Sequence, residues 1–379
     1  MNDISKIKEK MLQYEKNLSI NACTSKDAIR LKNTTKDIRS EYERDVDKII
    51  HALSYTRYID KTQVHSDLQN DNISKRMTHV QFVSRAARTI CRALELNEDL
   101  AEAIALGHDT GHVPFGHVGE KILSDISVKK TGKYFLHNLN SVRVLDVLEK
   151  NGNGLNLTLQ TLDGIMCHNG ELVQSHYKPV KKDFYTLFEE YSKCIKDPKY
   201  LKNIKPMTLE GCVVRISDLI GYLGKDIDDA VMLGVIDIKD IPKNITNVLG
   251  TKNDEIMNNI IIDVIENSFN KPYIEMSKKM YEAISNLKEF NYENIYSKVN
   301  SAKDLQKFKD IFEKLFEVYI KAVETSDLKN DIYTTFLKNM NKNYLMENSN
   351  EQKVIDYISG MTDSFIEKQY EKYVMQGEV

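Results

Sequence analysis

The chain has 379 residues, of which 41% are hydrophobic and 29% are charged, and this balance excludes a disordered chain. Its length predicts one large domain or two coupled ones, and its net charge of -3 argues against a protein that wraps nucleic acid by bulk charge. Five cysteines, none in a C-x-x-C pair, indicate neither a disulfide framework nor a thiolate zinc site, which favours a reducing, cytoplasmic setting.

Neither a targeting segment nor a membrane span is expected. The first ten residues, MNDISKIKEK, are polar and lack the apolar core of a signal peptide. No uncharged apolar run approaches the roughly 20 residues that a membrane span needs. We therefore expect a cytoplasmic protein without membrane contact.

The pattern of apolar residues predicts an all-α fold. Only 6 prolines and 16 glycines interrupt the chain, and apolar residues recur mostly at three-and-four spacing. We expect an N-terminal helical segment over residues 1–45, a core over 46–235 that holds the histidine clusters, and a C-terminal helical region over 236–379. The Asn-Gly pairs at 151–154 predict the clearest loop.

The first informative helix is predicted from about Ser74 to Leu94. His79 lies four residues before Val83, on the apolar stripe of this helix, so its side chain is expected to point inward.

A second helix is predicted to start after Asn97, a plausible N-cap with acidic residues in the first turn. Its inward residue Ile104 leads to His108 at the next step of four. Gly107 and Gly111 bracket the predicted helix end. His108 is therefore expected where a helix stops, facing the core.

A third helix is predicted from about Thr208 to Leu233, with a regular apolar stripe. A second stripe, centred more than a quarter-turn away, is polar. It consists of Arg215, Asp218, Tyr222, Asp226 and Asp229. On this helix alone, a solvent-facing surface and a functional face are equally good interpretations.

The densest cluster of chemically active side chains is the segment 107–120, GHDTGHVPFGHVGE. Its imidazoles and carboxylates are ligands that a divalent cation accepts, and its glycines allow close backbone approach. A single histidine is more often an ordinary core or surface residue. Combined with an inward His79 and with Asp218, however, the pair His108-Asp109 makes an H…HD…D set drawn from three helices.

These residues resemble the HD-domain family of deoxyguanosine triphosphate triphosphohydrolases, and the resemblance extends from about Arg57 to Tyr370. It is specific for the fold and the site but less so for the base recognised. The matching motifs are RYIDKTQV at 57–64, KRMTH at 75–79, HDTGHVPFGHVGE at 108–120, FLHNLNSVR at 135–143, SDLIGY at 217–222, DIDD at 226–229 and DYISGMTD at 356–363.

The resemblance implies an HD-domain helical bundle over 46–235, with an added C-terminal layer over 236–379 that completes the substrate pocket and makes oligomer contacts. It implies one divalent metal ion per active site, with manganese or magnesium expected first and iron, cobalt or nickel as alternatives. The implied metal ligands are His79, His108, Asp109 and Asp218.

The resemblance also implies the roles of other residues. His117 resembles the catalytic histidine, Glu120 resembles the carboxylate that orients it, and His112 lies in the same signature near the α-phosphate. The implied substrate contacts are Gln63, Tyr222 and Asp226 at the deoxyribose, Arg76 at a phosphate and Asp363 near the sugar pocket. For His137 and Asn138, contact with substrate and bracing of the site both stay open.

The implied reaction is hydrolysis of a deoxynucleoside triphosphate, dGTP first, to deoxynucleoside and inorganic tripolyphosphate. His117 would be the general acid for the 5′-oxygen, with activation of the nucleophile as the alternative. We hypothesise that Tyr222 packs under the sugar and excludes a 2′-hydroxyl. Two departures are Val113 in place of a proline and Gly221 at a helical position, where glycine costs about 1 kcal/mol.

Two other functions compete with this one. The chain could be another HD-type nucleotide phosphohydrolase, or a regulatory module that binds nucleotide or nucleic acid without turnover. The resemblance further implies a homo-oligomer and an allosteric nucleotide. No P-loop is present. Lys178, Lys181 and Lys182 could contact polyphosphate or single-stranded DNA, but a solvated charged loop is the favoured interpretation.

Overall fold

The computed structural model describes residues 3–35, 37–63, 74–169, 173–298 and 301–376, and the described chain is all-α, as predicted. Two short antiparallel strands also pair among the described residues, β1 (His176–Tyr177) with β2 (Ile274–Glu275). In this pair His176 lies opposite Glu275. Along the described chain, no helix is both long enough and apolar enough to cross a bilayer.

The N-terminal part and the core contain the three helices expected from spacing, here α4, α5 and α11. Their bounds, with those of the neighbouring elements, are α1 (Asp3–Met11), η1 (Leu12–Asn17), α2 (Glu41–Ile50), α3 (Leu53–Thr56), η2 (Arg57–Asp60), α4 (Arg76–Ala93), α5 (Glu98–Gly107), α6 (Gly116–Thr131), α7 (His137–Arg143), η3 (Val144–Leu148), α8 (Glu149–Gly152), α9 (Leu159–Met166), α10 (Phe184–Cys194), η4 (Pro198–Lys202) and α11 (Leu209–Met232).

The C-terminal region packs as two groups. The first follows α11 and consists of η5 (Ile238–Asp240), α12 (Lys243–Leu249), α13 (Asn253–Ser268), α14 (Lys278–Asn294) and η6 (Tyr296–Lys298). The second consists of α15 (Ala302–Glu324), η7 (Ile332–Phe336), η8 (Leu337–Asn339), α16 (Lys342–Glu347), α17 (Asn350–Ser359), α18 (Asp363–Tyr370) and η9 (Glu371–Met375).

Helix ends are set by side-chain caps that the sequence supplies. The Asn97 side chain accepts hydrogen bonds from the backbone N–H groups of residues 99 and 100, as predicted for the start of α5. Thr208 caps α11 by accepting from Gly211 N at 3.0 Å. At the predicted loop, Asn151 and Gly152 have φ values of 59° and 87°, so the chain turns there.

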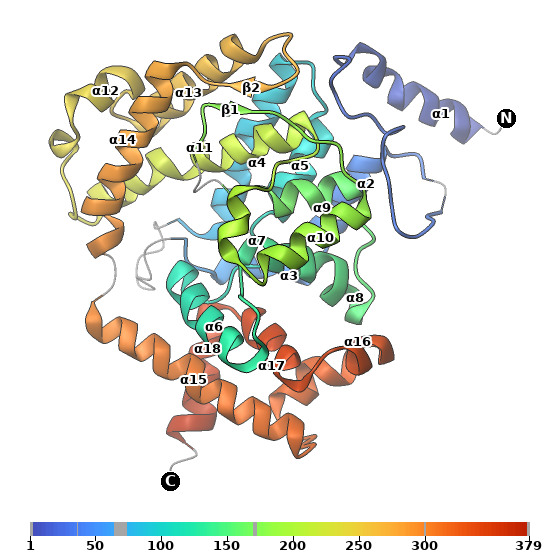
Figure 1. The fold of residues 1–379 in the computed structure, drawn as a ribbon, viewed down its shortest axis with the longest axis vertical. Helices are drawn as coiled ribbons and strands as arrows, with labels where there is room; N and C mark the ends of the chain where they lie inside the picture. Colours follow the sequence, from blue (N-terminus) through green and yellow to red (C-terminus); the bar gives the residue numbers. More distant parts are fainter. Residues whose placement is uncertain (1–2, 36, 64–73, 170–172, 299–300, 377–379) are drawn as a thin grey trace.

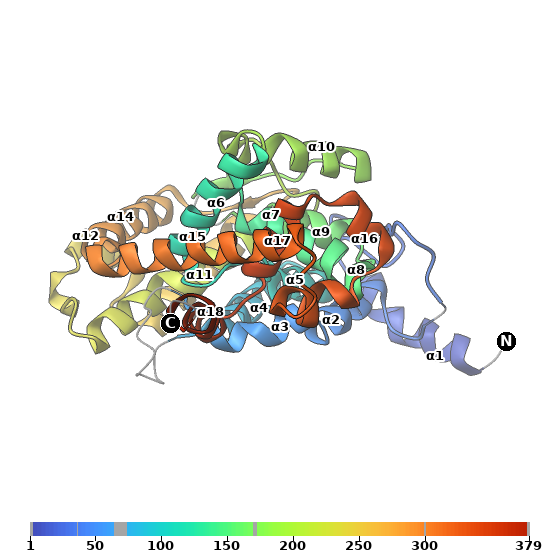
Figure 2. The same cartoon turned by 90° about the horizontal axis from the view of Figure 1, so that it is seen from below.

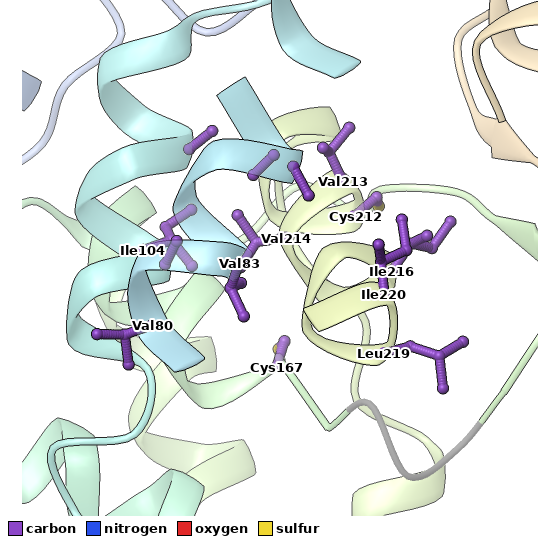
Figure 3. Packing of buried hydrophobic residues seen from close by; sticks show 14 of the residues in the cluster. Val80, Val83, Ile104, Cys167, Cys212, Val213, Val214, Ile216, Leu219 and Ile220 are labelled. Atoms are coloured by element: carbon purple, nitrogen blue, oxygen red, sulfur yellow. The ribbon is translucent and has the colours of Figure 1, made fainter. Parts of the chain in front are cut away.

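The main hydrophobic core lies between α4, α5 and α11 (Figure 3). Val83 from α4, Ile104 from α5 and Val213 from α11 are fully buried in it. Truncation of Ile104 to alanine would cost about 2–5 kcal/mol, because the cavity left behind is only partly refilled. The helices that carry the predicted site are therefore held by a rigid core.

A second hydrophobic cluster joins α6 to the group that begins with α15. Phe312 and Tyr319 from α15 pack in it with Leu123 from α6 and Ile358 from α17. Helix α15 runs alongside α6 and α17 (Figures 1 and 2). Helices α12, α13 and α14 lie at the opposite end of the long axis in Figure 1, where α13 and α14 pack against α11. The predicted boundaries at 45/46 and 235/236 stay predictions.

Candidate active site

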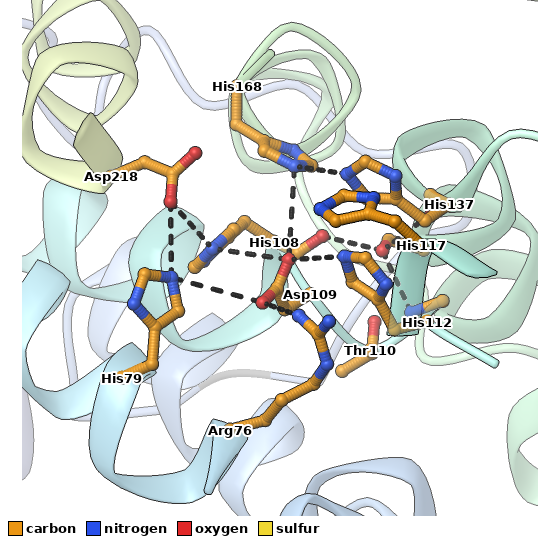
Figure 4. Close-up of polar contacts among 12 residues, drawn as sticks. Arg76, His79, His108, Asp109, Thr110, His112, His117, His137, His168 and Asp218 are labelled. Atoms are coloured by element: carbon orange, nitrogen blue, oxygen red, sulfur yellow. Dashed lines mark hydrogen bonds and ion pairs between the residues drawn. The ribbon is translucent and has the colours of Figure 1, made fainter. Parts of the chain in front are cut away.

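The four predicted metal ligands come together from α4, the end of α5 and the middle of α11 (Figure 4). His79 Nε2 lies 3.1 Å from Asp218 Oδ1 and 3.9 Å from Asp109 Oδ2. His108 Nε2 lies 3.4 Å from Asp109 Oδ1 and 3.6 Å from Asp218 Oδ1. Two imidazoles and two carboxylates from distant stretches of sequence thus converge on one small volume.

The donor atoms of this cluster fit a divalent cation. His108 Nδ1 donates to the carbonyl oxygen of Ala105 at 2.7 Å, so the neutral ring carries its lone pair on Nε2. That Nε2 atom is buried and has no hydrogen-bond partner among the described residues. A buried imidazole nitrogen without a partner, facing two carboxylates, is the arrangement of a metal ligand whose other nitrogen is held by a backbone carbonyl. His79, His108 and Asp109 are close enough together to hold one ion.

Both carboxylates of the cluster are held in the ionised form. Burial disfavours the charge of Asp109, but His108, His112 and Arg76 outweigh it and hold its pKa well below the usual range. Burial also acts against the charge of Asp218, but the nearby imidazoles of His108 and His79 outweigh it and lower the pKa of that carboxyl.

The polar stripe of α11 is not a solvent-facing surface, and that interpretation is wrong. Asp218, Asp226 and Asp229 are all buried. The departure at Gly221 has a packing reason, since a Cβ atom there would lie 2.8 Å from Val83 Cγ2 and 3.4 Å from the His79 ring. Glycine lets α11 approach α4 closely at the level of the predicted metal ligands.

A second cluster, which we call the imidazole end, consists of His117, Glu120 and His137. The Glu120 carboxylate accepts hydrogen bonds from His117 Nδ1 at 3.2 Å and from His137 Nδ1 at 3.0 Å. Burial acts against its charge, but these two imidazoles hold its pKa well below the usual range. The His117 side chain is 57% exposed. Glu120 therefore orients two imidazoles at once, one of them facing solvent.

His112 connects the two clusters. Its Nε2 lies 3.2 Å from Asp109 Oδ1, and its ring stacks on that of His137 with centroids 4.0 Å apart. Burial and the nearby Arg76 hold the pKa of His112 well below its usual value, so the ring is neutral. Since a carboxylate cannot donate, Nε2–H donates to Asp109.

The loop that leads into α6 is strained and is held from outside the core. Phe115 has a φ of 61°, an uncommon value for a non-glycine residue. Its backbone N–H donates to Asp363 Oδ1 at 3.0 Å, and its ring stacks on Phe308 of α15 at 4.1 Å. Asp363 Oδ2 accepts from Thr62 N at 2.9 Å. Asp363, predicted to bind substrate, therefore braces two loops and is not part of the cavity lining.

A cavity of about 490 Å³ opens onto both clusters, a volume in the range of small-molecule sites. The lining contains ten of the predicted or considered residues: Gln63, Arg76, His79, Asp109, His112, His117, His137, Asp218, Tyr222 and Asp226. His108 lies behind this lining, and Glu120 lines an adjoining cavity with His117 and His137. Val64, at the end of the first motif, lies outside the described residues.

Arg76 and Asp226 place a guanidinium group and a carboxyl group on the cavity wall. Arg76 Nη1 donates to Asp109 Oδ2 at 2.6 Å, while its Nε and Nη2 are buried without a hydrogen-bond partner among the described residues. Burial raises the pKa of Asp226 to about 7, although the hydrogen bond from the Tyr296 hydroxyl, at 2.7 Å, acts in the other direction.

Several lining residues were missed from the sequence. His168 lies in the site, with Nε2 3.2 Å from His137 Nε2 and 4.0 Å from Asp109 Oδ1. Its signal was weak: a histidine just past the buried helix α9, as His108 follows α5. Lys288, Tyr292 and Tyr296 reach the cavity from α14 and η6, and nothing in their spacing indicated it.

Asn138 and Lys182 both make contacts inside the protein, and whether Asn138 also contacts substrate stays open. Asn138 donates from Nδ2 to the carbonyl oxygen of Met166 at 2.7 Å, so it braces α7 against α9. Lys182, expected on a solvated loop, is only 2% exposed in its side chain and pairs with Asp163 at 2.7 Å and Glu190 at 2.6 Å. Lys178 and Lys181 are exposed.

Comparison with known families matches two stretches of the chain. Residues 76–222 match the HD domain, and residues 274–372 match the phosphohydrolase-associated domain. The first stretch includes every predicted metal ligand and both residues of the His117–Glu120 pair. The second includes the helices that carry Lys288, Tyr292, Phe308 and Asp363.

Curated relatives align with most of the chain. A protein named "Deoxyguanosinetriphosphate triphosphohydrolase-like protein" from Caldanaerobacter subterraneus subsp. tengcongensis is 38% identical over 340 residues, which cover 89% of this chain and 85% of the relative. Proteins of the same name from Clostridium tetani and Neorickettsia sennetsu are 35% and 31% identical, each over 88% of this chain and over 86% and 91% of their own lengths.

Proposed function

Because the chain belongs to the family of deoxyguanosinetriphosphate triphosphohydrolase-like proteins and carries an HD domain, we propose that it hydrolyses deoxynucleoside triphosphates, dGTP first, to deoxynucleoside and inorganic tripolyphosphate. At the coarser level it is an HD-type nucleotide phosphohydrolase. The observation that carries the finer proposal is one cavity that joins a buried His/Asp cluster, an arginine with unpaired N–H groups and a carboxylate-oriented histidine.

HD domains bind divalent metal ions, and His79, His108, Asp109 and Asp218 would hold the ion here, with manganese or magnesium expected. When bound, the ion would supply Lewis-acid polarisation of a phosphoryl oxygen and lower the pKa of a water. His112 would keep Asp109 in place through its Nε2–H, at 3.2 Å.

Arg76 would bind the polyphosphate. Its Nη1 is already paired with Asp109, so the carboxylate fixes the plane of the guanidinium. The unpaired Nε and Nη2 are buried, and a buried charged donor without a partner costs free energy until an acceptor arrives. Phosphate oxygens are the acceptors that a planar guanidinium binds best.

His117 would donate the proton that the 5′-oxygen needs in order to leave. Imidazole is matched to proton transfer near neutral pH. Glu120 accepts a hydrogen bond from Nδ1 of His117, so the proton that His117 transfers to the 5′-oxygen would be the one on Nε2. Activation of the nucleophile by the same nitrogen is the alternative role.

Gln63, Tyr222 and Asp226 would hold the deoxyribose. Asp218, Tyr222 and Asp226 follow one another at four-residue steps along α11, so one rigid helix would join the metal ligands to the sugar contacts. Gln63 Oε1 is buried without a partner among the described residues, and a sugar hydroxyl would satisfy it. Tyr222→Ala should lose discrimination between dGTP and GTP, measured as the ratio of kcat/KM values; an unchanged ratio would remove Tyr222 from this role.

The decisive experiment identifies products. Metal-replete protein is incubated with each deoxynucleoside triphosphate, alone and in pairs, and the phosphorus products are resolved by ³¹P NMR. Pairs are included because an activating nucleotide is implied by the family resemblance. We expect tripolyphosphate and no diphosphate. The matched variant His117→Ala should bind nucleotide but release far less tripolyphosphate.

Other outcomes would replace the proposal. Diphosphate or monophosphate as the first product would make the chain a different HD phosphohydrolase. Nucleotide binding without any product would make it a regulatory module. Size-exclusion chromatography with light scattering would test the expected homo-oligomer, and fractionation of cells would test the expected cytoplasmic location.

A further inference from the structure

Lys61 is a buried lysine whose ammonium group contacts backbone carbonyl groups. It follows η2 directly and is only 2% exposed. Its Nζ donates to the carbonyl oxygen of His112 and to that of Ser359, the second at 3.2 Å. Burying an ammonium group costs free energy, and these two carbonyl groups are the partners that offset the cost.

The first of these carbonyl groups begins the loop that leads into α6. This loop, residues 112–116, passes through the uncommon φ of 61° at Phe115. The Phe115 N–H donates to Asp363 at 3.0 Å, and the N–H of Thr62, next to Lys61, donates to the same carboxylate at 2.9 Å. Two neighbouring residues therefore support both halves of a strained loop, which keeps such a conformation only where its surroundings impose it.

The contact with Lys61 fixes the peptide group beside the His112 ring. The N–H of His112 donates to the carbonyl oxygen of Asp109 at 3.0 Å, and its carbonyl accepts from Lys61. Because these groups flank one Cα atom, they set the direction in which the ring leaves the loop. The ring lies with Nε2 3.2 Å from Asp109 Oδ1 and stacks on His137. Misplacement of an active-site group by about 1 Å can cost on the order of 100-fold in rate.

We propose that Lys61 is a positioning residue of the active site, whose ammonium group holds the His112 carbonyl and thereby keeps the His112 ring in place. It acts from behind the loop, because Lys61 lines a separate cavity of about 620 Å³ and does not line the cavity that would take the substrate. The kinetic effect of this role rests on the proposed function, in which His112 lies near the α-phosphate.

The ammonium form of Lys61 supports the loop better than the neutral amine. Burial lowers the pKa of Lys61 to about 7, and the guanidinium groups of Arg57 and Arg76 act in the same direction. The carboxylates of Asp363 and Asp109 act against them. A charged donor makes hydrogen bonds roughly twice as strong as a neutral one, so the loop carbonyl is held best while Lys61 is protonated. The support weakens as the pH rises through about 7.

Lys61→Met, which nearly keeps the length of the side chain and removes its charge, tests this role in the full metal-replete protein. With dGTP at about pH 6, kcat should fall about tenfold to a hundredfold, with KM and metal content within about twofold of the wild type. Because the wild type loses the same charge as the pH rises, the ratio of the two kcat values should shrink at least about threefold by about pH 9. Lys150→Met, which replaces an exposed lysine in the lining of the same cavity, is the matched control and should change neither quantity.

Nuclear magnetic resonance of the histidine rings tests the role without nucleotide, in magnesium-loaded protein. In the wild type, His112 should give the ¹⁵N shifts of one neutral ring with its proton on Nε2, since that proton is donated to Asp109. In Lys61→Met these shifts should move toward those of mixed tautomers, while those of the exposed His176 stay unchanged. Lys61→Arg keeps a charge that does not titrate, and the adjoining cavity has room for it, so it should restore the wild-type His112 signal.

Three results would overturn the role. An unchanged His112 signal in folded Lys61→Met protein would mean that the carbonyl contact does not place the ring. A kcat ratio that stays constant with pH would mean that the charge of Lys61 does not support the loop. Rate losses in both Lys61 variants that only match the loss of folded protein, measured by circular dichroism, would make the residue a structural one. If the wild type fails to hydrolyse dGTP, the proposed function fails, and the ring signal alone decides the role of Lys61.

Discussion

The two ends of the cavity are built differently. The ligand end, which consists of His79, His108, Asp109 and Asp218, is buried and rises from helices of one hydrophobic core. The imidazole end has its exposed histidine on the first turn of α6, after a strained loop that depends on Asp363 and on the second hydrophobic cluster. The difference teaches that metal binding and proton transfer can be disturbed separately, because different packing supports each.

The largest effect is expected at the ligand end. Asp109→Ala removes one of the predicted metal ligands and leaves Arg76 Nη1 without its partner. Bound manganese should fall to near zero, and the lost Lewis-acid contribution of several kcal/mol should lower turnover by about a thousandfold or more. Metal analysis with rate measurement checks this. Asp228→Ala, on α11 but outside the cavity lining, is the control; a metal-bound, active Asp109→Ala protein would refute the ligand assignment.

A smaller loss, confined to turnover, is expected at the imidazole end. His117→Ala should lower kcat by about 10²- to 10⁴-fold, the usual contribution of a positioned acid or base, while the metal content stays that of the wild type. Glu120→Gln should lower kcat less, because the histidine remains but its orientation is weaker. If His117→Ala also loses metal, the two ends are not separable and the comparison fails.

The link between the ends and the C-terminal helices is tested at Asp363. Asp363→Asn keeps one acceptor but replaces the other with a donor, which cannot satisfy the N–H groups of both Thr62 and Phe115. We expect a kcat loss of about tenfold with unchanged metal content, and a stability loss of about 1–3 kcal/mol. Glu367→Ala on the same helix breaks an exposed pair with Lys307 and should change neither quantity.

The smallest effect on the site is expected from Glu210, on the first turn of α11 and remote from both ends. Its Oε1 accepts from the backbone N–H groups of Cys23 and Asn97, and burial raises the pKa of this carboxyl from 4.5 to about 7. A carboxyl with a raised folded-state pKa stabilises most below about pH 4.5, and this contribution is lost as pH rises through about 7.

The size of this pH effect on stability can be stated, and a variant that lacks the ionisable group tests it. A shift of this size corresponds to roughly 3 kcal/mol in total, of which about 2.5 kcal/mol falls between pH 5 and pH 8. Glu210→Gln, which cannot ionise, should remove that part of the pH dependence of unfolding by urea and leave kcat unchanged. If both proteins lose equal stability between the two pH values, Glu210 is not the group responsible.

Local sequence patterns were sufficient to predict the three central helices, α4, α5 and α11. Asn97 caps α5 as predicted, α11 begins next to the predicted Thr208, and the position of His79 on an apolar stripe predicted its burial. These features depend on contacts within a few residues, which a helical period or a capping residue expresses directly. The same is true of the His117–Glu120 pair, separated by three residues on one helix.

The other residues that line or support the cavity could not be predicted, because they depend on contacts between distant segments that no local pattern expresses. Tyr296 reaches Asp226 across 70 positions, and Asp363 reaches Thr62 across 301. Whether the polar face of α11 meets solvent or a cavity was undecidable from that helix, since an isolated charged stripe has the same spacing in either case. The sequence by itself determined the helices, the residue types of the candidate metal ligands and the family. Only the packing of α14, α15 and α18 against the core decided which side chains share a cavity, because proximity between distant segments is set by how buried surfaces fit together.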